Sequence, residues 1–366
     1  MKSVWWRQLK AVMRLELKKT FFARRGLWIY LVALLPVLLF MAYATAVSRV
    51  QGRMADVARH GQKPLTYQDL LAVKQGMTNE EVIASVGKPA STVRWKVART
   101  TGADASEDGV HERYNYSDGQ QELYVEFVDG RAETVIVRDG NNLQRDSVMF
   151  AGVFQFFFLR LAIFFGCLGV FMNLFRGEIL DRSLHFYFLA PIRREVLMAG
   201  KFLAGLIATS TIFVASEVLQ TTAFLWAFHP NVRNLYLYHN HGLEHAAAYV
   251  GITVLACIGY GAFFLIAGMF FRNPIVPTAV ILIWEGINPF LPAVLKQVSV
   301  IYYLKSLCPV DVPVPPGMPP LLALLISNPE PISEPVAVFG LLTVALVALY
   351  VSSLQVRRME INYTTE

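Results

Sequence analysis

Charged residues are scarce in this chain, and cysteines are few and far apart. Only 16% of the 366 residues are Asp, Glu, Lys or Arg, whereas 55% are hydrophobic. Soluble globular domains carry roughly 25% charged residues, so the composition excludes an ordinary soluble protein. The three cysteines, Cys167, Cys257 and Cys308, form no C-x-x-C pair. This spacing argues against a disulfide framework and against a cysteine zinc site.

A nucleotide-binding loop is also missing. The phosphate-cradling pattern is G-x-x-x-x-G-K-[ST], and no segment of the chain matches it. Gly200-Lys201 is followed by Phe202 and lacks the upstream glycine. The chain is therefore not expected to be an enzyme that hydrolyses ATP, and any such chemistry must come from another polypeptide.

Six apolar runs are long enough to cross the hydrocarbon core of a bilayer, which is about 30 Å thick. They are approximately 26–47, 149–175, 202–228, 246–271, 275–293 and 336–356. The predicted fold class is an all-α polytopic membrane protein with six transmembrane helices. One of these precedes a soluble insert and five lie within 149–366. Because six is even, both termini are expected on one side.

Lys and Arg are distributed unequally between the two sides. Segment 1–25, loop 176–201, Arg272 and the Arg357-Arg358 pair carry sixteen, whereas the short loops opposite carry three. Cytoplasmic loops carry the excess of positive charge. Both termini are therefore predicted in the cytoplasm, as for a bacterial inner-membrane protein. Topology accounts for the net charge of +6, so no nucleic-acid partner is expected.

Segment 1–25 has the pattern of an amphipathic helix. Its apolar residues recur at helical spacing, and basic residues occupy the other face. The apolar set is Trp5, Trp6, Leu9, Val12, Met13, Leu17 and Phe21. The pattern predicts a helix in the cytoplasmic interface, with its lysines toward anionic membrane lipid. The alternative is a cytosolic helix packed on a partner.

Residues 48–148 differ from the rest of the chain, with thirteen basic and fifteen acidic residues. Thr78 and Glu81 form a T-x-x-E capping box, and Gly87 is expected to end that helix. Two alternating strands flank Asp129-Gly130, a strong hairpin signal. Four aromatic residues are expected to pack the sheet: Tyr114, Tyr116, Tyr124 and Phe127. The segment is predicted to be a small α+β domain outside the membrane.

The run "GMTNEEVIASVGKP" and the later "VEFVDGRAETVIV" resemble the small domain of SmpA/OmlA (BamE-like) lipoproteins. The likeness covers about residues 70–139. The lipid-attachment cysteine of that family is absent, so the resemblance implies the fold but not the family's anchoring. It leaves two alternatives open, a spacer domain and a module that binds a periplasmic ligand.

Loop 176–201 lies between the second and third apolar runs and reads "RGEILDRSLHFYFLAPIRREVLMAGK". Leu184, Phe186, Phe188 and Leu189 can pack on a partner, and Pro191 interrupts the run. The order of a basic N-terminal helix, a span, a large outer loop and this segment resembles a type-2 ABC exporter permease. Seven residues match that family's loop pattern: Glu178, Asp181, Arg182, Pro191, Arg193, Gly200 and Lys201.

The resemblance implies a permease subunit that pairs with a second permease copy and two ATP-binding subunits. ATP and Mg would be bound on those partners and no cofactor on this chain. Loop 176–201 would transmit ATP-driven closure to the spans. The expected coupling residues are the seven above together with Leu184, Phe186, Phe188 and Arg194. Ser183-Leu184-His185-Phe186 departs from the family's usual Gly-Thr-Leu-Glu. The alternative is a basic loop that only sets topology.

Ionisable residues within the apolar runs are candidates for a substrate path. Each costs about 2.5–3.5 kcal/mol at the bilayer centre, so each should face protein or a wet cavity. Arg160 and Glu217 are expected at a similar depth and could form an ion pair. The predicted path comprises Arg160, Glu217, Gln220, Thr221 and Glu285. A purely structural interhelical pair is the alternative.

The outer loop "YHNHGLEHAAAY" contains H-x-x-E-H, a zinc-protease signature. This motif makes His239, His241 and His245 the residues to consider as metal ligands. The loop is short and lacks a third ligand in a cleft, so no metal site is predicted. Two rival functions remain, a membrane metalloenzyme using this motif and a scaffold presenting 48–148. The proline-rich segment 294–335 is predicted to form re-entrant or interfacial helices on the outer face.

Overall fold

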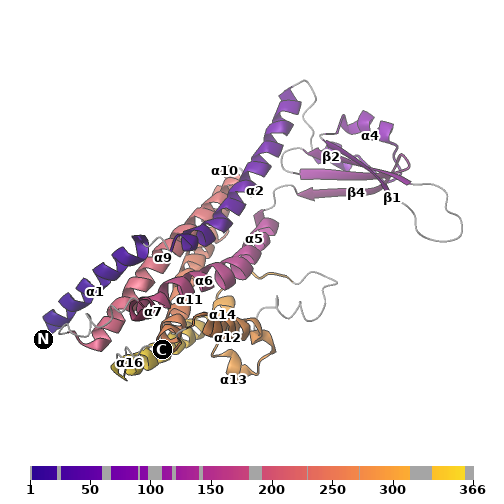
Figure 1. Ribbon diagram of the computed structural model, residues 1–366. Helices are drawn as coiled ribbons and strands as arrows, with labels where there is room; N and C mark the ends of the chain where they lie inside the picture. The colour runs from indigo at the N-terminus through magenta and orange to yellow at the C-terminus, as the bar shows by residue number, and fades with distance from the viewer. Residues whose placement is uncertain are drawn as a thin grey trace. The chain divides into compact units, whose positions relative to one another are not determined.

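The structure is a computed structural model, and it describes eleven stretches of the chain. They are residues 2–22, 26–59, 67–89, 91–97, 109–117, 121–139, 143–180, 192–228, 230–271, 273–313 and 332–358. The chain divides into two compact units, residues 42–146 and the remainder (Figure 1). Each unit is described by itself.

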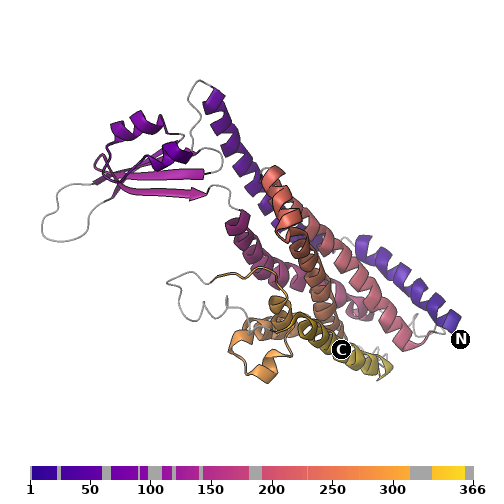
Figure 2. The same ribbon diagram turned by 180° about the vertical axis from the view of Figure 1, so that it is seen from behind.

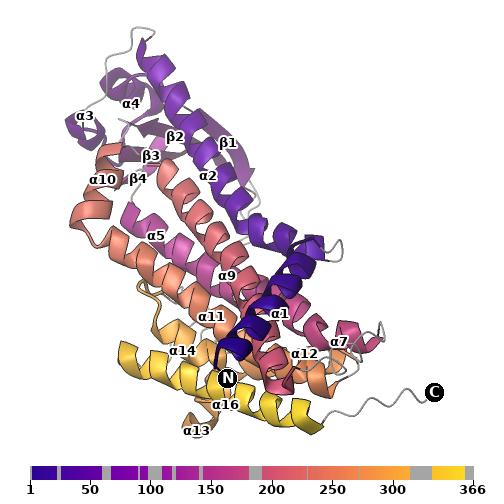
Figure 3. The same ribbon diagram turned by 90° about the vertical axis from the view of Figure 1, so that its left-hand side faces the viewer.

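The larger unit is helical. Its described helices are α1 (Lys2–Phe22), α2 (Leu27–Arg59), α5 (Leu143–Gly152), the π-helix η2 (Val153–Ile163), α6 (Phe164–Phe171), α7 (Asn173–Leu180), α9 (Arg194–Trp226), α10 (Pro230–His239), α11 (Gly242–Phe270), α12 (Ile275–Gly286), the 3-10 helix η3 (Asn288–Phe290), α13 (Ala293–Lys296), α14 (Val300–Ser306) and α16 (Glu334–Arg358). Two of them, α2 and α5, also include residues of the smaller unit. α9 packs against both α1 and α11 (Figure 3).

Within the described residues, five helical runs are long and apolar enough to cross a membrane. They are Leu27–Arg49, Arg145–Glu178, Arg194–Trp226, Gly242–Phe270 and Glu334–Arg358. The chain is therefore a multi-pass membrane protein, as the composition predicted.

The sixth full-length helix predicted over 275–293 is not formed. α12 has 12 residues, which at 1.5 Å per residue is about 18 Å, well short of the bilayer core. The helix ends at Gly286, and Asn288 is followed by Pro289, which disfavours helical backbone in the residue before it. Composition alone made this run look longer than the backbone allows.

The two described ends of the helical unit lie at the same end of the bundle. The Arg194 guanidinium, at the start of α9, donates a hydrogen bond of 2.9 Å to the carbonyl oxygen of Arg357, at the end of α16. α1 packs on the same part of α9, because a side-chain carbon at Gly200 would lie 2.9 Å from Val12 Cγ1. We call this end, with the basic residues of α1 and the start of α9, the basic end.

The chain returns from the basic end to the opposite end between α11 and α16. The end of α11 lies near the basic end, since a side-chain carbon at Gly268 would lie 2.9 Å from the carbonyl oxygen of Met172, just before α7. α16 runs in the same direction as α11 and also finishes at the basic end, at Arg357. Of the segment between these two helices, described residues 273–313 contain the short helices α12, η3, α13 and α14. The described residues thus provide five of the six full-length spans predicted from the sequence.

The smaller unit contains a four-stranded antiparallel sheet in the order β1-β2-β3-β4. Its elements are α3 (Tyr67–Leu71), α4 (Asn79–Val86), β1 (Ser91–Val97), β2 (Gly109–Ser117), β3 (Gln121–Val128) and β4 (Arg131–Asp139). α3 and α4 pack on one face of the sheet (Figure 2). The core between them is formed by Leu70, Val73, Val82, Val86, Tyr114, Tyr116, Leu123, Val125, Phe127 and Ala132.

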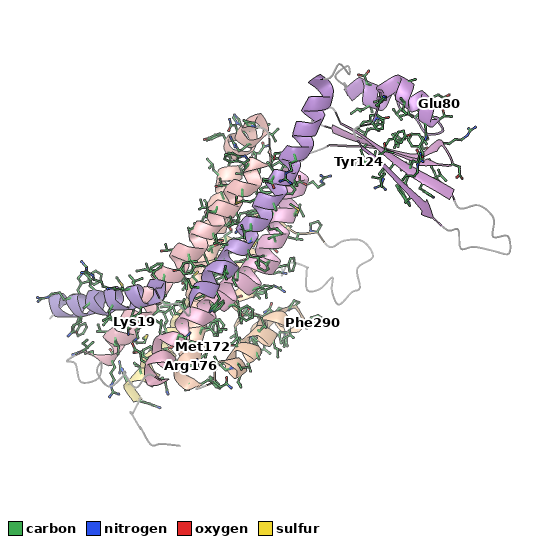
Figure 4. All side chains as sticks on the ribbon, turned by 45° about the horizontal axis from the view of Figure 1, so that its top comes forward. Lys19, Glu80, Tyr124, Met172, Arg176 and Phe290 are labelled. Atoms are coloured by element: carbon green, nitrogen blue, oxygen red, sulfur yellow. The ribbon has the colours of Figure 1, made fainter. Side chains whose placement is uncertain are left out.

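The local motifs predicted in this unit are confirmed. The Thr78 side chain accepts a hydrogen bond from the Glu81 amide while the Glu81 carboxylate accepts one from the Thr78 amide, and Gly87 caps the helix end with φ of 91°. Asp129 and Gly130 both have positive φ, as a two-residue hairpin turn requires. Tyr124 is the exception, because strand alternation turns it away from the face that buries Leu123 and Val125 (Figure 4).

Candidate functional site

A buried group of charges joins three helices at the basic end. Lys201, on α9, is fully buried, and its Nζ lies 2.8 Å from Glu16 Oε1 on α1 and 2.8 Å from Glu178 Oε1 on α7. The same nitrogen donates a hydrogen bond of 2.9 Å to the carbonyl oxygen of Leu174. Lys19 completes the group, which we call the Lys201 cluster: Glu16, Lys19, Glu178 and Lys201.

The local sequence explains why these side chains meet. Val12 and Glu16 are four residues apart on α1, so they share one helix face, and both are buried. Gly200 has no side chain to separate α1 from α9 where Val12 approaches. Lys201 is the next residue and extends into the space between α9, α1 and α7. The close approach at Gly200 thus positions the lysine beside both carboxylates.

Lys19 balances the second carboxylate. Its Nζ lies 3.1 Å from Glu178 Oε1 and 3.7 Å from Glu16 Oε1, and its side chain is half-exposed. Figure 4 shows Lys19 near the end of α1, beside the stretch of α7 that carries Arg176. Two cations and two carboxylates therefore share the cluster. Glu178 Oε2 is buried and accepts no hydrogen bond from the described residues.

The segment after loop residues 181–191 is anchored as well. The guanidinium carbon of Arg193 lies 4.5 Å from the centroid of the Trp5 ring on α1, a cation–π contact. Arg194 holds the end of α16, and Glu195 forms an ion pair of 2.6 Å with Arg357. Glu178 precedes the loop and these residues follow it. Both flanks of 181–191 are thus attached to helices of the bundle.

The predicted coupling residues fall into three groups. Glu178, Gly200 and Lys201 come together in or beside the Lys201 cluster, while Arg193 and Arg194 lie at the start of α9. The others lie outside the described residues: Asp181, Arg182, Leu184, Phe186, Phe188 and Pro191. Because Glu178 and Lys201 are buried, they hold the loop's flanks rather than present a surface to a partner.

Sequence reasoning missed two members of the cluster, Glu16 and Lys19. Segment 1–25 contains eight basic residues and a single acidic one, Glu16, which lies on the buried face of α1. An acid on a face that otherwise buries apolar side chains is a signal that it has a cationic partner. That partner is separated from it by 185 positions, so the sequence could not name it.

α1 combines the two alternatives weighed for it. It packs on α9 through Val12 and Glu16, yet Trp6 is 67% exposed and Leu15 is 46% exposed. Its outer face carries a shallow groove lined by basic and apolar side chains: Arg7, Lys10, Ala11, Arg14, Leu15, Lys18 and Lys19. The helix therefore has an intramolecular partner and also leaves an amphipathic face uncovered by the described residues.

The Arg160–Glu217 ion pair considered from the sequence is not formed among the described residues. The Glu217 carboxylate, which is buried on α9, instead accepts a hydrogen bond of 3.0 Å from the Thr221 hydroxyl. It also accepts one from the Gln220 amide. Glu217, Gln220 and Thr221 thus form one polar group within a single helix, and Arg160 lies elsewhere, on η2.

Glu285 caps a short helix. One carboxylate oxygen accepts a hydrogen bond of 2.8 Å from the Ser299 hydroxyl and one of 2.9 Å from the Ile301 amide, and the other accepts one of 2.9 Å from the Val300 amide. These amides lie at the start of α14, where helix N–H groups lack partners of their own. The structure therefore gives this buried acid, predicted on the substrate path, a role in positioning α14.

The histidine-rich loop does not converge on one point. His241 Nδ1 lies 2.8 Å from Glu244 Oε2, and His245 Nδ1 lies 3.1 Å from the Tyr236 hydroxyl. Among the residues that the structure describes, no three His, Cys, Asp or Glu side chains are grouped as a metal site requires. The two histidines of the H-x-x-E-H motif are each engaged separately, and His239 does not join them. The geometry thus offers no support for a zinc-protease site at the H-x-x-E-H motif.

Comparisons with known proteins do not identify the chain: no family model, no curated protein and no solved structure matches it.

Proposed function

We propose that the chain is the transmembrane permease subunit of an ATP-driven ABC exporter of the type-2 class. The Lys201 cluster is the observation that supports this most directly, because it attaches both flanks of 181–191 to the bundle. A loop that receives a push from a soluble motor needs stiff attachments to the membrane helices. A loop that only sets topology has no need of buried ion pairs at its base.

The contacts suggest how a displacement of the loop would be passed on. Before the loop, α7 is held by Glu178 to Lys201. After it, α9 is held to α1 through Lys201, Arg193 and the close approach at Gly200, and to α16 through Arg194. Interfaces of this kind shift as units rather than deform continuously. Movement of the loop would therefore tilt α7 and α9 together, with α1 and α16 following.

The remaining parts of the proposal follow from the sequence. ATP and Mg would be bound by separate ATP-binding subunits, since this chain has no phosphate-cradling loop, and a second permease copy would complete the pathway. The basic end would face the cytoplasm of a bacterium, by the positive-inside rule. The four-stranded unit, with its capped helix and antiparallel strands, would have the BamE-like fold that its sequence resembles and would bind a ligand on the outer side.

A detergent pull-down tests the proposal. The tagged chain is purified gently from its own host, co-purifying proteins are identified by mass spectrometry, and ATP hydrolysis is measured in the eluate. We compare the wild type with a loop variant, Leu184→Asp/Phe188→Asp. The matched control, Leu235→Asp/Leu243→Asp, introduces the same number of aspartates at exposed leucines of α10 and α11 at the opposite end.

An ATP-binding subunit that accompanies the wild type and the control, but not the loop variant, would support the proposal. If the wild type retains no ATPase, the permease function is overturned. Stoichiometric zinc in that eluate would then favour the metalloenzyme, and its absence would favour a scaffold presenting residues 48–148.

A further inference from the structure

One face of α1 carries a row of basic side chains. Lys10, Arg14 and Lys18 are four residues apart, so they lie one above the other along the helix, about 6 Å per step. All three are exposed, and they line the shallow groove on this helix together with the apolar residues Ala11 and Leu15. We call Lys10, Arg14 and Lys18 the α1 basic row.

The packing of α1 fixes the direction in which the α1 basic row points. Each of its members is two positions from Val12 or Glu16, which is about 200° around the helix axis. Val12 and Glu16 are buried, Val12 beside Gly200 and Glu16 beside Lys201. The row therefore lies on the side of α1 that faces away from α9.

The described residues do not neutralise the α1 basic row. Glu16 is the single acidic residue of α1, and on the buried side it contacts Lys19 and Lys201. Among the residues that the structure describes, none forms an ion pair with a member of the row. Three positive charges on one exposed face are thus available to an anionic partner.

α1 is attached to the ends of two membrane spans. It ends at Phe22, and the first candidate span begins at Leu27. Near its other end, Trp5 contacts Arg193, which directly precedes the candidate span beginning at Arg194. Figure 3 shows α1 beside the first part of α9. The α1 basic row therefore lies at the level where the spans leave the bilayer, and the lipid headgroups are the anionic surface nearest to it.

We infer that the α1 basic row binds the phosphate groups of anionic phospholipids in the leaflet at the basic end. Lysine offers a point charge to phosphate oxygens, and Arg14 offers paired N–H donors. At about 100° per residue, the exposed side chains of Trp6 and Leu15 flank the row on either side. Such apolar flanks enter the boundary between headgroups and acyl chains. A membrane lipid supplies both the charge and the hydrocarbon that this face requires.

Hydrogen–deuterium exchange of the full chain in lipid nanodiscs tests the inference. The discs contain either zwitterionic phosphatidylcholine alone or phosphatidylcholine mixed with anionic phosphatidylglycerol. Lipid bound along the outer face should restrain the opening of α1, so amide exchange over residues 2–22 reports binding. We expect phosphatidylglycerol to slow this exchange about fivefold or more in the wild type, the factor that one cation contributes beside an anionic surface. High salt should remove the difference.

Three variants are compared with the wild type. Lys10→Gln/Arg14→Gln/Lys18→Gln removes the row and should exchange at the same rate in both kinds of disc. A second variant exchanges lysine and arginine within the row, keeps the charges and should behave as the wild type. Gel filtration and thermal unfolding identify any variant that does not fold. The matched control should also behave as the wild type, because it removes three exposed basic residues of the smaller unit: Lys74→Gln/Lys88→Gln/Arg131→Gln.

Equal exchange of wild-type α1 in both kinds of disc would overturn the inference, as would equal slowing in the glutamine variant. Soluble glycerol phosphate that slows exchange as strongly in zwitterionic discs would also overturn it, because the row would then take a free headgroup rather than membrane lipid. Slowing that requires an added ATP-binding subunit would assign this face to a protein instead. The inference does not depend on the permease function, which the pull-down tests separately.

Discussion

Replacing Lys201 with methionine removes the central charge of the Lys201 cluster while keeping most of the side-chain volume. Glu16 and Glu178 each have an oxygen 2.8 Å from Nζ, so those two oxygens are at most about 5.6 Å apart. In the variant the two buried carboxylates would face each other with Lys19 as their remaining described cation. The Leu174 carbonyl would also lose its donor.

The expected loss of stability is large for a single substitution. Removing one partner of a buried ion pair destabilises by about 3–5 kcal/mol, because it leaves an uncompensated charge. Removing the carboxylates as well should recover most of this loss, since replacing a whole buried network is often neutral. The triple variant Lys201→Met/Glu16→Gln/Glu178→Gln should therefore be more stable than Lys201→Met alone.

The measurement is the free energy of unfolding in mixed detergent micelles, with unfolding monitored by circular dichroism. Lys10→Met is the matched control, because Lys10 is exposed on the same helix, and it should change stability by less than about 0.5 kcal/mol. A loss below about 1 kcal/mol for Lys201→Met, or a triple variant no more stable than the single one, would refute the reasoning that the cluster is a buried, mutually compensating network.

Three further outcomes are expected. Gly200→Val forces a side chain onto Val12 and should destabilise by about 1–3 kcal/mol while making α1 more sensitive to trypsin; unchanged proteolysis would contradict the close packing of α1. Glu285→Ala leaves the start of α14 uncapped and should lower stability by about 1–3 kcal/mol, with Glu285→Gln losing less, as thermal unfolding can show. Thr78→Ala removes a helix cap and should cost about 0.5–2 kcal/mol in urea unfolding, against no measurable loss for Ser85→Ala.

Local motifs in the small unit were predictable because each depends on neighbours in sequence. Thr78 and Glu81 are three residues apart, and the Asp129-Gly130 turn needs only backbone that glycine and aspartate adopt readily. Tyr124 shows what residue type alone fails to predict. As an aromatic residue in a strand it was expected to pack in the core. Alternation along β3 places it on the face opposite Leu123, so the register of the strand decided its burial.

The site was predictable only in part. Glu178, Gly200 and Lys201 were found through the order of features around loop 176–201, but their burial was not. The length of the helix predicted over 275–293 was overestimated, because hydropathy does not indicate where the backbone turns. The proposed Arg160–Glu217 pair rested on equal depth alone, and depth says nothing of the direction in which each side chain leaves its helix.

By itself, the sequence determined that this is a multi-pass membrane protein with a capped-helix and antiparallel-strand insert, since hydrophobicity and turn chemistry are local properties. Only the tertiary structure decided which charges share a partner. Glu16 meets Lys201, and Lys305 reaches the ring of Phe156, across more than a hundred positions. These long-range contacts depend on how the helices pack. Helix packing in turn depends on the glycines and aromatic side chains that fix how closely two helices approach.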